Sequence, residues 1–316
     1  MADIEQYIQS ATRENTRKAY RQAIEKFEVD WGGFLPTTAD KVADYLFAHR
    51  EALSINTLRL HLAALSEWHS TQGFPDPTKA PRVKKLFKGI RLQHPQPEKR
   101  AKPLMLETLE AVVAYIDQEL VAEATLADPG LTGKLLRNRA LILLSFWRAF
   151  RSDEICRMNI EHTRIEENHG MVIYLPRTKV DRQALGQEYR VPALQRLCPV
   201  SAYRDWLYYL NETEGPVFRK VDQWGNVGKK GLHADSIIPL IRSALHAAGV
   251  EHAEQYTSHS FRRGFATWAN GHAWDFKDLM AYVGWSDPRS AMRYIDKTQQ
   301  VGDSINASLK ALDAPG

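Results

Sequence analysis

The stretch Ser258–Thr298 reads SHSFRRGFATWANGHAWDFKDLMAYVGWSDPRSAMRYIDKT and divides into three segments with helical spacing. Gly284 is typical of the residue that ends a helix. Ser286 or Asp287, followed by Pro288, is typical of the start of the next one. The pattern predicts three short helices, over 258–269, 275–283 and 288–295.

The start of this stretch combines groups that suit an anion. On a helix, His259 and Arg262 are three residues apart and share one face. Ser258 is a natural N-cap, and the free N–H groups of a first helical turn favour an anion such as a phosphate. A His and an Arg at this spacing also occur often by chance on solvated surfaces, so the pair alone decides nothing.

Tyr294 fits two different roles. It follows Ala291 at helical spacing, and such a residue is usually a core aromatic. A tyrosine hydroxyl can instead be a covalent nucleophile when nearby cations lower the cost of its oxyanion. The second role requires cationic side chains from elsewhere in the chain.

Two upstream segments offer such cations. Arg151 stands in the junction between an apolar helix and a helix that starts at Ser152, and Glu154 is the capping-box partner. Arg151 is either a solvated corner residue or a fork, held by the carboxylate, that grips two phosphate oxygens. Lys179 stands where a strand meets its turn. It is either solvated or able to deliver a proton where nearby cations favour its neutral form.

The fold class expected is mainly α with a small antiparallel β-sheet. The segments GMVIYLPRTK (170–179) and EYRVPAL (188–194) flank a polar connection and predict an antiparallel hairpin. Helical spacing is present over 12–31, 37–50, 54–73, 80–93, 106–120, 133–147, 152–158, 199–211 and 233–248.

The stretch HPQPEKRAKP (His94–Pro103) has three prolines, mixed charge and no apolar periodicity, which is typical of a linker. We therefore expect a helical N-terminal domain over 1–93 and a second domain over 104–316. Residues 1–100 carry the whole net charge of +4, and eight basic residues stand against Glu98 within 79–100. A polyanion partner fits this region, although a solvated helix face with a charged linker has the same composition.

Composition argues against several classes of protein. No apolar run approaches the ~18 residues of a membrane span, and the opening MADIEQYIQSATREN lacks the pattern of a signal peptide. The two cysteines, Cys156 and Cys198, support neither a disulfide framework nor a cysteine-based zinc site. We expect a cytoplasmic protein with no metal and no cofactor.

Taken together and in order, these residues resemble the motif of the tyrosine recombinases, the phage integrase family. The resemblance covers nearly the whole chain, including NTLRLHLAALSEWHSTQGFPDPT (56–78) and the basic helix before the linker. That segment, and a Trp at 285 where many relatives have His, look most like one particular member of the family. The residues that match are Arg151, Glu154, Lys179, His259, Arg262, Gly284, Trp285 and Tyr294.

The resemblance implies a two-domain DNA clamp, a helical core-binding domain plus a catalytic domain. Tyr294 would attack the scissile phosphate, form a 3′-phosphotyrosyl link and release a 5′-hydroxyl. Arg151, Arg262 and the Trp285 indole N–H would bind the non-bridging oxygens. Fixed donors of this kind are typically worth on the order of 10²–10³ in rate each, so the set could work without a metal. Because the covalent link would conserve the phosphodiester energy, religation would need no ATP.

The resemblance also implies supporting and binding roles. His259 would assist proton removal from the tyrosine, Lys179 would protonate the leaving oxygen, and Glu154 would buttress the Arg/His cluster. Phe150 stands where relatives often have Gly, and Trp285 cannot shuttle a proton, so acid–base work would fall on Lys179 and His259. Expected DNA contacts are Arg59, Lys84, Lys85, Lys88, Arg91 and Arg242.

The expected partner is duplex DNA with a specific recombination site, bound by a homodimer at each site and a tetramer in synapsis. The segment VGDSINASLKALDAPG (301–316) is expected to form a helix that packs into a neighbouring protomer. A bacterial, phage or plasmid origin fits. Telomere resolvase, topoisomerase-like strand transfer, a non-catalytic DNA-binding role and a small-molecule phosphatase remain as alternatives.

Overall fold

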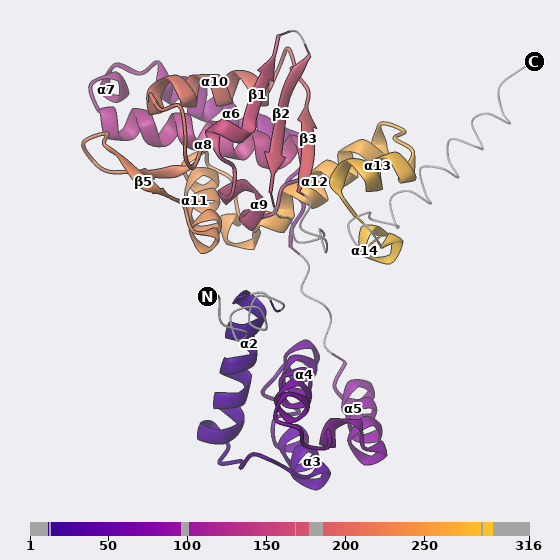
Figure 1. Cartoon of the computed structure of the whole chain (residues 1–316). Coiled ribbons are helices and arrows are strands. Elements are labelled where there is room, and N and C mark those ends of the chain that lie inside the picture. The colour runs from indigo at the N-terminus through magenta and orange to yellow at the C-terminus, as the bar shows by residue number, and fades with distance from the viewer. Residues whose placement is uncertain are drawn as a thin grey trace, which may run out of the picture. The chain divides into compact units, whose positions relative to one another are not determined.

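The structure is a computed structural model that describes residue 12 and the ranges 14–95, 101–167, 169–176, 186–285 and 287–292. The chain divides into two compact units, Met1–Lys99 and Arg100–Gly316. Figure 1 colours the chain continuously by residue number, from indigo in the first unit to yellow at the end of the described part of the second. Each unit is considered by itself. No helix of the described residues is long and apolar enough to cross a membrane.

The first unit is a group of helices around one apolar core. The Thr38 and Ser54 side chains cap two of its helices by accepting from the backbone N–H groups of Lys41 and Thr57. Phe27 and Tyr45 pack edge to face at the centre, with ring centroids 5.1 Å apart. The elements are α2 (Glu14–Glu25), η1 (Lys26–Asp30), α3 (Ala39–Ala48), α4 (Ile55–Thr71), η2 (Pro77–Lys79) and α5 (Pro81–Gln93).

Two buried histidines of α4 complete this core. His69 accepts a hydrogen bond from the Thr37 backbone N–H at 2.9 Å and contacts the Leu65 carbonyl at 2.7 Å. His61 lies 2.6 Å from the Tyr45 hydroxyl. Both rings therefore satisfy polar groups inside the unit, as buried polar side chains must.

The second unit is built on α8 (Pro129–Trp147), a helix whose C-terminal half is buried on all sides. An all-round apolar helix needs cover on every side. Helices α6, α10 and α12 supply it, since each packs against α8. Besides α8, the described helical elements of this unit are, in chain order, α6 (Leu106–Leu120), α7 (Glu123–Leu126), α9 (Ser152–Cys156), η3 (Ile160–His162), α10 (Pro199–Leu210), α11 (Ala234–Ala247), η4 (Ala253–Gln255), α12 (Ser258–Gly271), α13 (Phe276–Val283) and α14 (Pro288–Met292).

A three-stranded antiparallel sheet stands at the edge of this unit (Figure 1), in the order β1 (Thr163–Glu166), β2 (Gly170–Leu175) and β3 (Gln187–Val191). The predicted hairpin is β2–β3, with Met171 opposite Val191. The fold class is thus confirmed. The prediction missed β1 and the second pair, β4 (Arg219–Val221) and β5 (Val227–Gly231), because strands of three to five residues are too short to show alternation.

Helix α12 begins where predicted, but its N-cap is Thr257 and not Ser258. The Thr257 hydroxyl accepts from the His259 N–H, and the Ser260 hydroxyl accepts from the Thr257 N–H. The Leu104 N–H donates to the Ser260 carbonyl at 2.9 Å. Gly264 faces the same segment, and a Cβ there would overlap the Leu104 carbonyl. The chain at Leu104 therefore anchors α12 and the residues that it carries.

Candidate active site

The α8–α9 junction holds Arg151 in place with Glu154. Arg151 is the N-cap of α9, and its backbone N–H donates to Glu154 Oε2 at 2.8 Å. Its Nη1 donates to Glu154 Oε1 at 2.5 Å. The Glu154 side chain is buried, whereas 20% of the Arg151 side chain is exposed. The carboxylate therefore fixes a guanidinium that remains accessible to a ligand.

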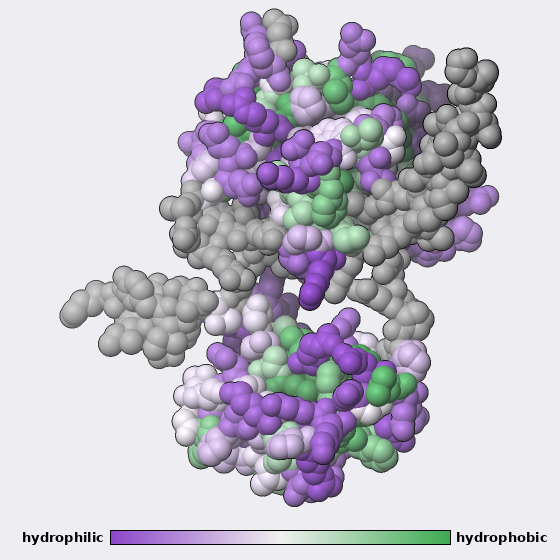
Figure 2. Space-filling model, turned by 90° about the vertical axis from the view of Figure 1, so that its right-hand side faces the viewer, coloured by the Kyte–Doolittle hydropathy of each residue, from purple (hydrophilic) through white to green (hydrophobic). Residues whose placement is uncertain are grey.

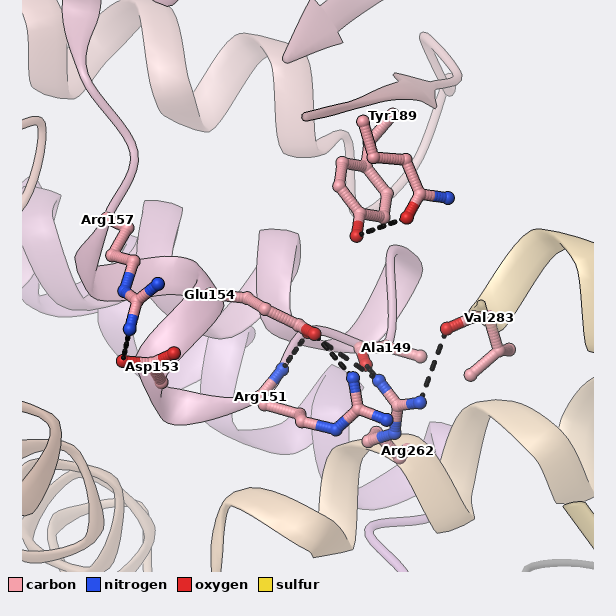
Figure 3. Close-up of polar contacts among 9 residues, drawn as sticks. Ala149, Arg151, Asp153, Glu154, Arg157, Tyr189, Arg262 and Val283 are labelled. Carbon is pink, nitrogen blue, oxygen red and sulfur yellow. Dashed lines mark hydrogen bonds and ion pairs between the residues drawn. The ribbon is translucent and has the colours of Figure 1, made fainter. Parts of the chain in front are cut away.

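Arg262 of α12 reaches the same carboxylate, and its guanidinium lies beside that of Arg151 (Figure 3). It is only 1% exposed. Its Nη1 donates to the Ala149 carbonyl at 2.5 Å and lies 3.7 Å from Glu154 Oε2. Its Nη2 donates to the Val283 carbonyl at 3.2 Å. Ala149 has a left-handed backbone (φ 53°), unusual for a residue other than glycine, and its carbonyl in this turn accepts from Arg262.

Trp285 follows α13 and lies over Arg262. Gly284 ends the helix with φ 74°, as its position predicts, and the Trp285 N–H donates to the Met280 carbonyl at 2.9 Å. The Arg262 guanidinium carbon lies 5.5 Å from the centre of the Trp285 ring. The Trp285 side chain is buried, so its indole is part of the packed wall beside the arginine.

His259 is the second residue of α12 and is exposed, one turn before the buried Arg262. The structure thus brings together Arg151, Glu154, Arg262 and Trp285. His259 lies on the exposed first turn of α12, the helix that carries Arg262. Lys179, Tyr294 and the segment 301–316 lie outside the described residues. Their predicted roles are not addressed by the geometry.

The cluster carries more positive than negative charge. Two guanidiniums face one carboxylate, Glu154, and the pair Asp153–Arg157 lies on the other side of α9, away from them (Figure 3). An excess cation in a partly buried setting favours an anionic ligand with several acceptor oxygens, such as a phosphate. Among the described residues, no group of three or more His, Cys, Asp or Glu side chains could hold a metal ion.

The Cys156 thiol, which lies near this cluster, is a poor candidate for a nucleophile. Cys156 ends α9, and burial, helped by the charge of Asp153, raises the pKa of its thiol to about 12. A thiol of that kind is almost fully protonated at neutral pH and therefore a poor nucleophile.

Sequence reasoning missed Arg148, the residue directly after α8. It is 5% exposed, and burial lowers the pKa of its guanidinium. The rings of Tyr189 and Tyr282 lie against it, at 4.8 and 4.0 Å from the guanidinium carbon. No local signal distinguishes Arg148 from a solvated arginine, because both of its partners come from distant parts of the chain.

The residues predicted to contact DNA fall into two kinds. Arg59 on α4 is exposed, as are four basic side chains of α5, Lys84, Lys85, Lys88 and Arg91, while Val83 and Ile90 turn to the core. Hydrophilic residues make up much of the visible surface of both units in Figure 2. Arg242 differs, since it is half-buried and its Nε donates to the Tyr256 carbonyl at 3.0 Å. This bond ties α11 to the turn before α12.

Comparisons with known proteins point in one direction. The model of the phage integrase family matches residues 127–300. An integrase/recombinase XerD homolog from Selenomonas ruminantium is 26% identical over 92% of this chain and 84% of its own length. Recombinase Cre from Escherichia phage P1 is 20% identical over 83% of this chain and 77% of its own. A crystal structure of the XerH site-specific recombinase bound to a palindromic difH substrate matches the fold with a TM-score of 0.62 at 17% identity, over 92% of this chain and 78% of that one.

Proposed function

The chain belongs to the phage integrase family and is a tyrosine-type site-specific recombinase that acts on DNA, and from this premise we propose that it cleaves and rejoins duplex DNA through a 3′-phosphotyrosyl intermediate at Tyr294. The observation that carries the proposal is the cluster in which Glu154 holds Arg151 beside the buried Arg262. Such a cluster is suited to hold the scissile phosphate.

The proposed reaction is an in-line transfer at phosphorus. The Tyr294 oxygen forms a bond to phosphorus while the bond to the 5′-oxygen breaks, and Lys179 gives that oxygen its proton. Arg151 and Arg262 stabilise the charge that builds up on the two non-bridging oxygens. Because the covalent link conserves the phosphodiester energy, the released 5′-hydroxyl rejoins by the reverse step without ATP or a metal.

Two aromatic side chains complete the proposed site. His259, at the exposed first turn of α12, assists the removal of the tyrosine proton and orients the phosphate. Trp285 adds an indole N–H donor and, by packing over Arg262, limits the movement of that guanidinium. Since an indole cannot shuttle a proton, the acid–base steps rest on His259 and Lys179.

We assign the two units to two tasks. Residues 1–93 are the core-binding domain, 94–103 the linker, and 104–316 the catalytic domain with a C-terminal inter-protomer segment. The exposed cations of α5 and Arg59 bind phosphates of the duplex, and Arg242 contributes either directly or by supporting α12. The palindromic substrate of the XerH relative fits a dimer on each site, and strand exchange between two sites then requires a tetramer.

A closer likeness to Cre is proposed from Trp285 and the segment 56–78. The relatives from a bacterium and a phage support action on bacterial, phage or plasmid DNA in the cytoplasm. The XerD homolog is the more similar of the two relatives, so Cre-like features apply to these residues and not to the chain as a whole.

The test uses suicide duplexes with a nick near the scissile phosphate, built from inverted repeats in the DNA that flanks the gene. The wild type should form a covalent adduct that survives a denaturing gel, and Tyr294→Phe should form none while it still binds the duplex. The absence of an adduct with the wild type on every repeat, or an equal adduct with Tyr294→Phe, contradicts the proposal.

A further inference from the structure

Arg148 is a buried cation to which the proposed reaction gives no role. Its Nε and Nη1 atoms have no hydrogen-bond acceptor in the part of the chain that the structure describes. Instead, its guanidinium carbon lies 4.0 Å from the ring centre of Tyr282 and 4.8 Å from that of Tyr189. Two aromatic rings, whose faces attract cations, therefore lie against the charge, and the Tyr282 side chain also hydrogen-bonds to it.

Holding a charge at this position is costly. Burial disfavours the charged form of Arg148, and Tyr282, Tyr189 and Glu154 act in the opposite direction. A neutral side chain of similar length would fill the same space without that cost. Unlike such a neutral side chain, the guanidinium attracts the faces of both rings at once and so connects them.

The two rings belong to separate elements that border the active site. Tyr189 lies in β3, the strand that follows the range 177–185, which contains Lys179. Tyr282 lies in the last turn of α13, and the next residue, Val283, accepts from Arg262. The Tyr282 hydroxyl also donates to the Trp147 carbonyl at 2.8 Å, so α13 is joined to the end of α8 at two points.

We propose that Arg148 is a positioning residue of the recombination reaction. By binding both rings, it joins β3 and α13 to the α8–α9 junction and so aligns the segments of Lys179 and Tyr294 with the phosphate held by Arg151 and Arg262. The inference rests on the function proposed above for those side chains. It predicts that loss of the charge slows cleavage and leaves DNA binding largely intact.

Three variants separate this role from simple packing. Arg148→Met keeps the length and removes the charge, and Arg148→Lys restores a charge. The matched control is Arg137→Met on α8, the helix that Arg148 follows, because Arg137 is also buried but bonds to Asn138 and to the Arg219 carbonyl. Each is measured for thermal stability, for the Kd of a site duplex, and for the rate of covalent adduct formation at saturating DNA.

We expect Arg148→Met to bind the duplex within about threefold of the wild type and to form the adduct about 30-fold more slowly, which is the effect of losing the desolvated cation–π interaction of the guanidinium with its two rings. Arg148→Lys should recover part of the rate, since an ammonium keeps the charge but not the planar fork. Arg137→Met should cleave within about threefold of the wild type even where it lowers thermal stability.

A second pair of variants covers the case in which Arg148→Met does not fold. Tyr282→Leu leaves the charge in place and removes one ring together with the hydroxyl bond to the Trp147 carbonyl, and it should show the same loss of rate with retained binding. Tyr282→Phe removes the hydroxyl alone and should keep most of the rate. Where both single variants fold, the double variant should be no slower than the slower single one, because the two side chains act as a unit.

The outcomes distinguish the two proposals. If the wild type forms no adduct, the proposed function fails and the positioning role fails with it. If the wild type forms the adduct and Arg148→Met, or Tyr282→Leu in its place, does so at the wild-type rate, the positioning role alone is wrong. Equal losses of binding and cleavage, or multiplicative effects in the double variant, also overturn it.

Discussion

Replacement of Glu154 by alanine should strongly destabilise the second unit. The two carboxylate oxygens of Glu154 accept the backbone N–H and Nη1 of Arg151, and Oε2 also lies 3.7 Å from Nη1 of Arg262. Removing one partner of a buried ion pair typically costs about 3–5 kcal/mol. The lower half of that range fits here, because Arg151 is 20% exposed and can turn to water, whereas Arg262 stays buried with two carbonyl acceptors.

Glu154→Gln divides this loss into its parts. The amide oxygen can still accept the Arg151 backbone N–H, but the negative charge is gone. Hydrogen bonds to charged groups contribute roughly 1.5–3 kcal/mol each, so we expect Glu154→Gln to lose about that much and to lie between the wild type and Glu154→Ala.

The free energy of unfolding of the second unit is measured by urea unfolding, monitored through hydrogen exchange of the backbone amides of α8 and α12. The control is Asp153→Ala, because Asp153 is on the same short helix and pairs with Arg157 at the surface, where 39% of the Asp153 side chain is exposed. That pair should contribute less than about 1 kcal/mol. If Glu154→Ala costs no more than Asp153→Ala, Glu154 does not hold the arginine cluster and the proposed site loses its basis.

Three further predictions concern other parts of the chain. Gly264→Ala should cost about 1–3 kcal/mol by thermal unfolding, since its Cβ would overlap the Leu104 carbonyl, whereas Gly271→Ala, with open space around it, should be neutral or stabilising; equal effects would refute the packing argument. Burial, with the charges of Lys26 and His49, lowers the pKa of His61 in the folded protein. As the pH falls below about 6.5, His61 therefore takes up a proton more readily in the unfolded chain than in the folded one, and the first unit should lose stability. His61→Gln should flatten that slope in urea titrations between pH 5 and 7, and an unchanged slope would show that another group titrates. Replacement of three lysines of α5 by glutamine should weaken the salt dependence of DNA binding: Lys84, Lys85 and Lys88. The slope of the logarithm of the DNA-binding constant against log salt concentration should fall by on the order of 0.9 for each DNA phosphate that the variant no longer neutralises. An unchanged slope would exclude these side chains from the interface.

Local signals explain which parts of the fold could be predicted. The bounds of α6 follow from amphipathic spacing, and those of α13 from the Asp275 cap and the Gly284 stop, all of which act within a few residues. The short strands β1, β4 and β5 were missed because their pairing is set by tertiary contacts. The same holds for the N-cap at Thr257, where one of two adjacent hydroxyl residues is chosen by the turn that precedes α12.

In the candidate site, too, the contacts between residues close in the sequence were predictable and the contacts between distant segments were not. The junction of Arg151 with Glu154 is local and was predicted, and the structure adds that Arg262 reaches the same carboxylate. The burial of Arg148 was not predictable, because it depends on Tyr189 and Tyr282, which the fold brings from distant segments. The roles of Lys179 and Tyr294 remain predictions.

The most direct test of the proposed reaction identifies the residue that carries the DNA. The covalent adduct from a suicide duplex is digested with nuclease and trypsin, and the peptide that retains a nucleotide is sequenced by mass spectrometry. We expect the peptide that begins at Tyr294 and ends at Lys297, with the nucleotide joined through its 3′-phosphate to the Tyr294 oxygen. A nucleotide on any other side chain, or joined through a 5′-phosphate, would contradict it.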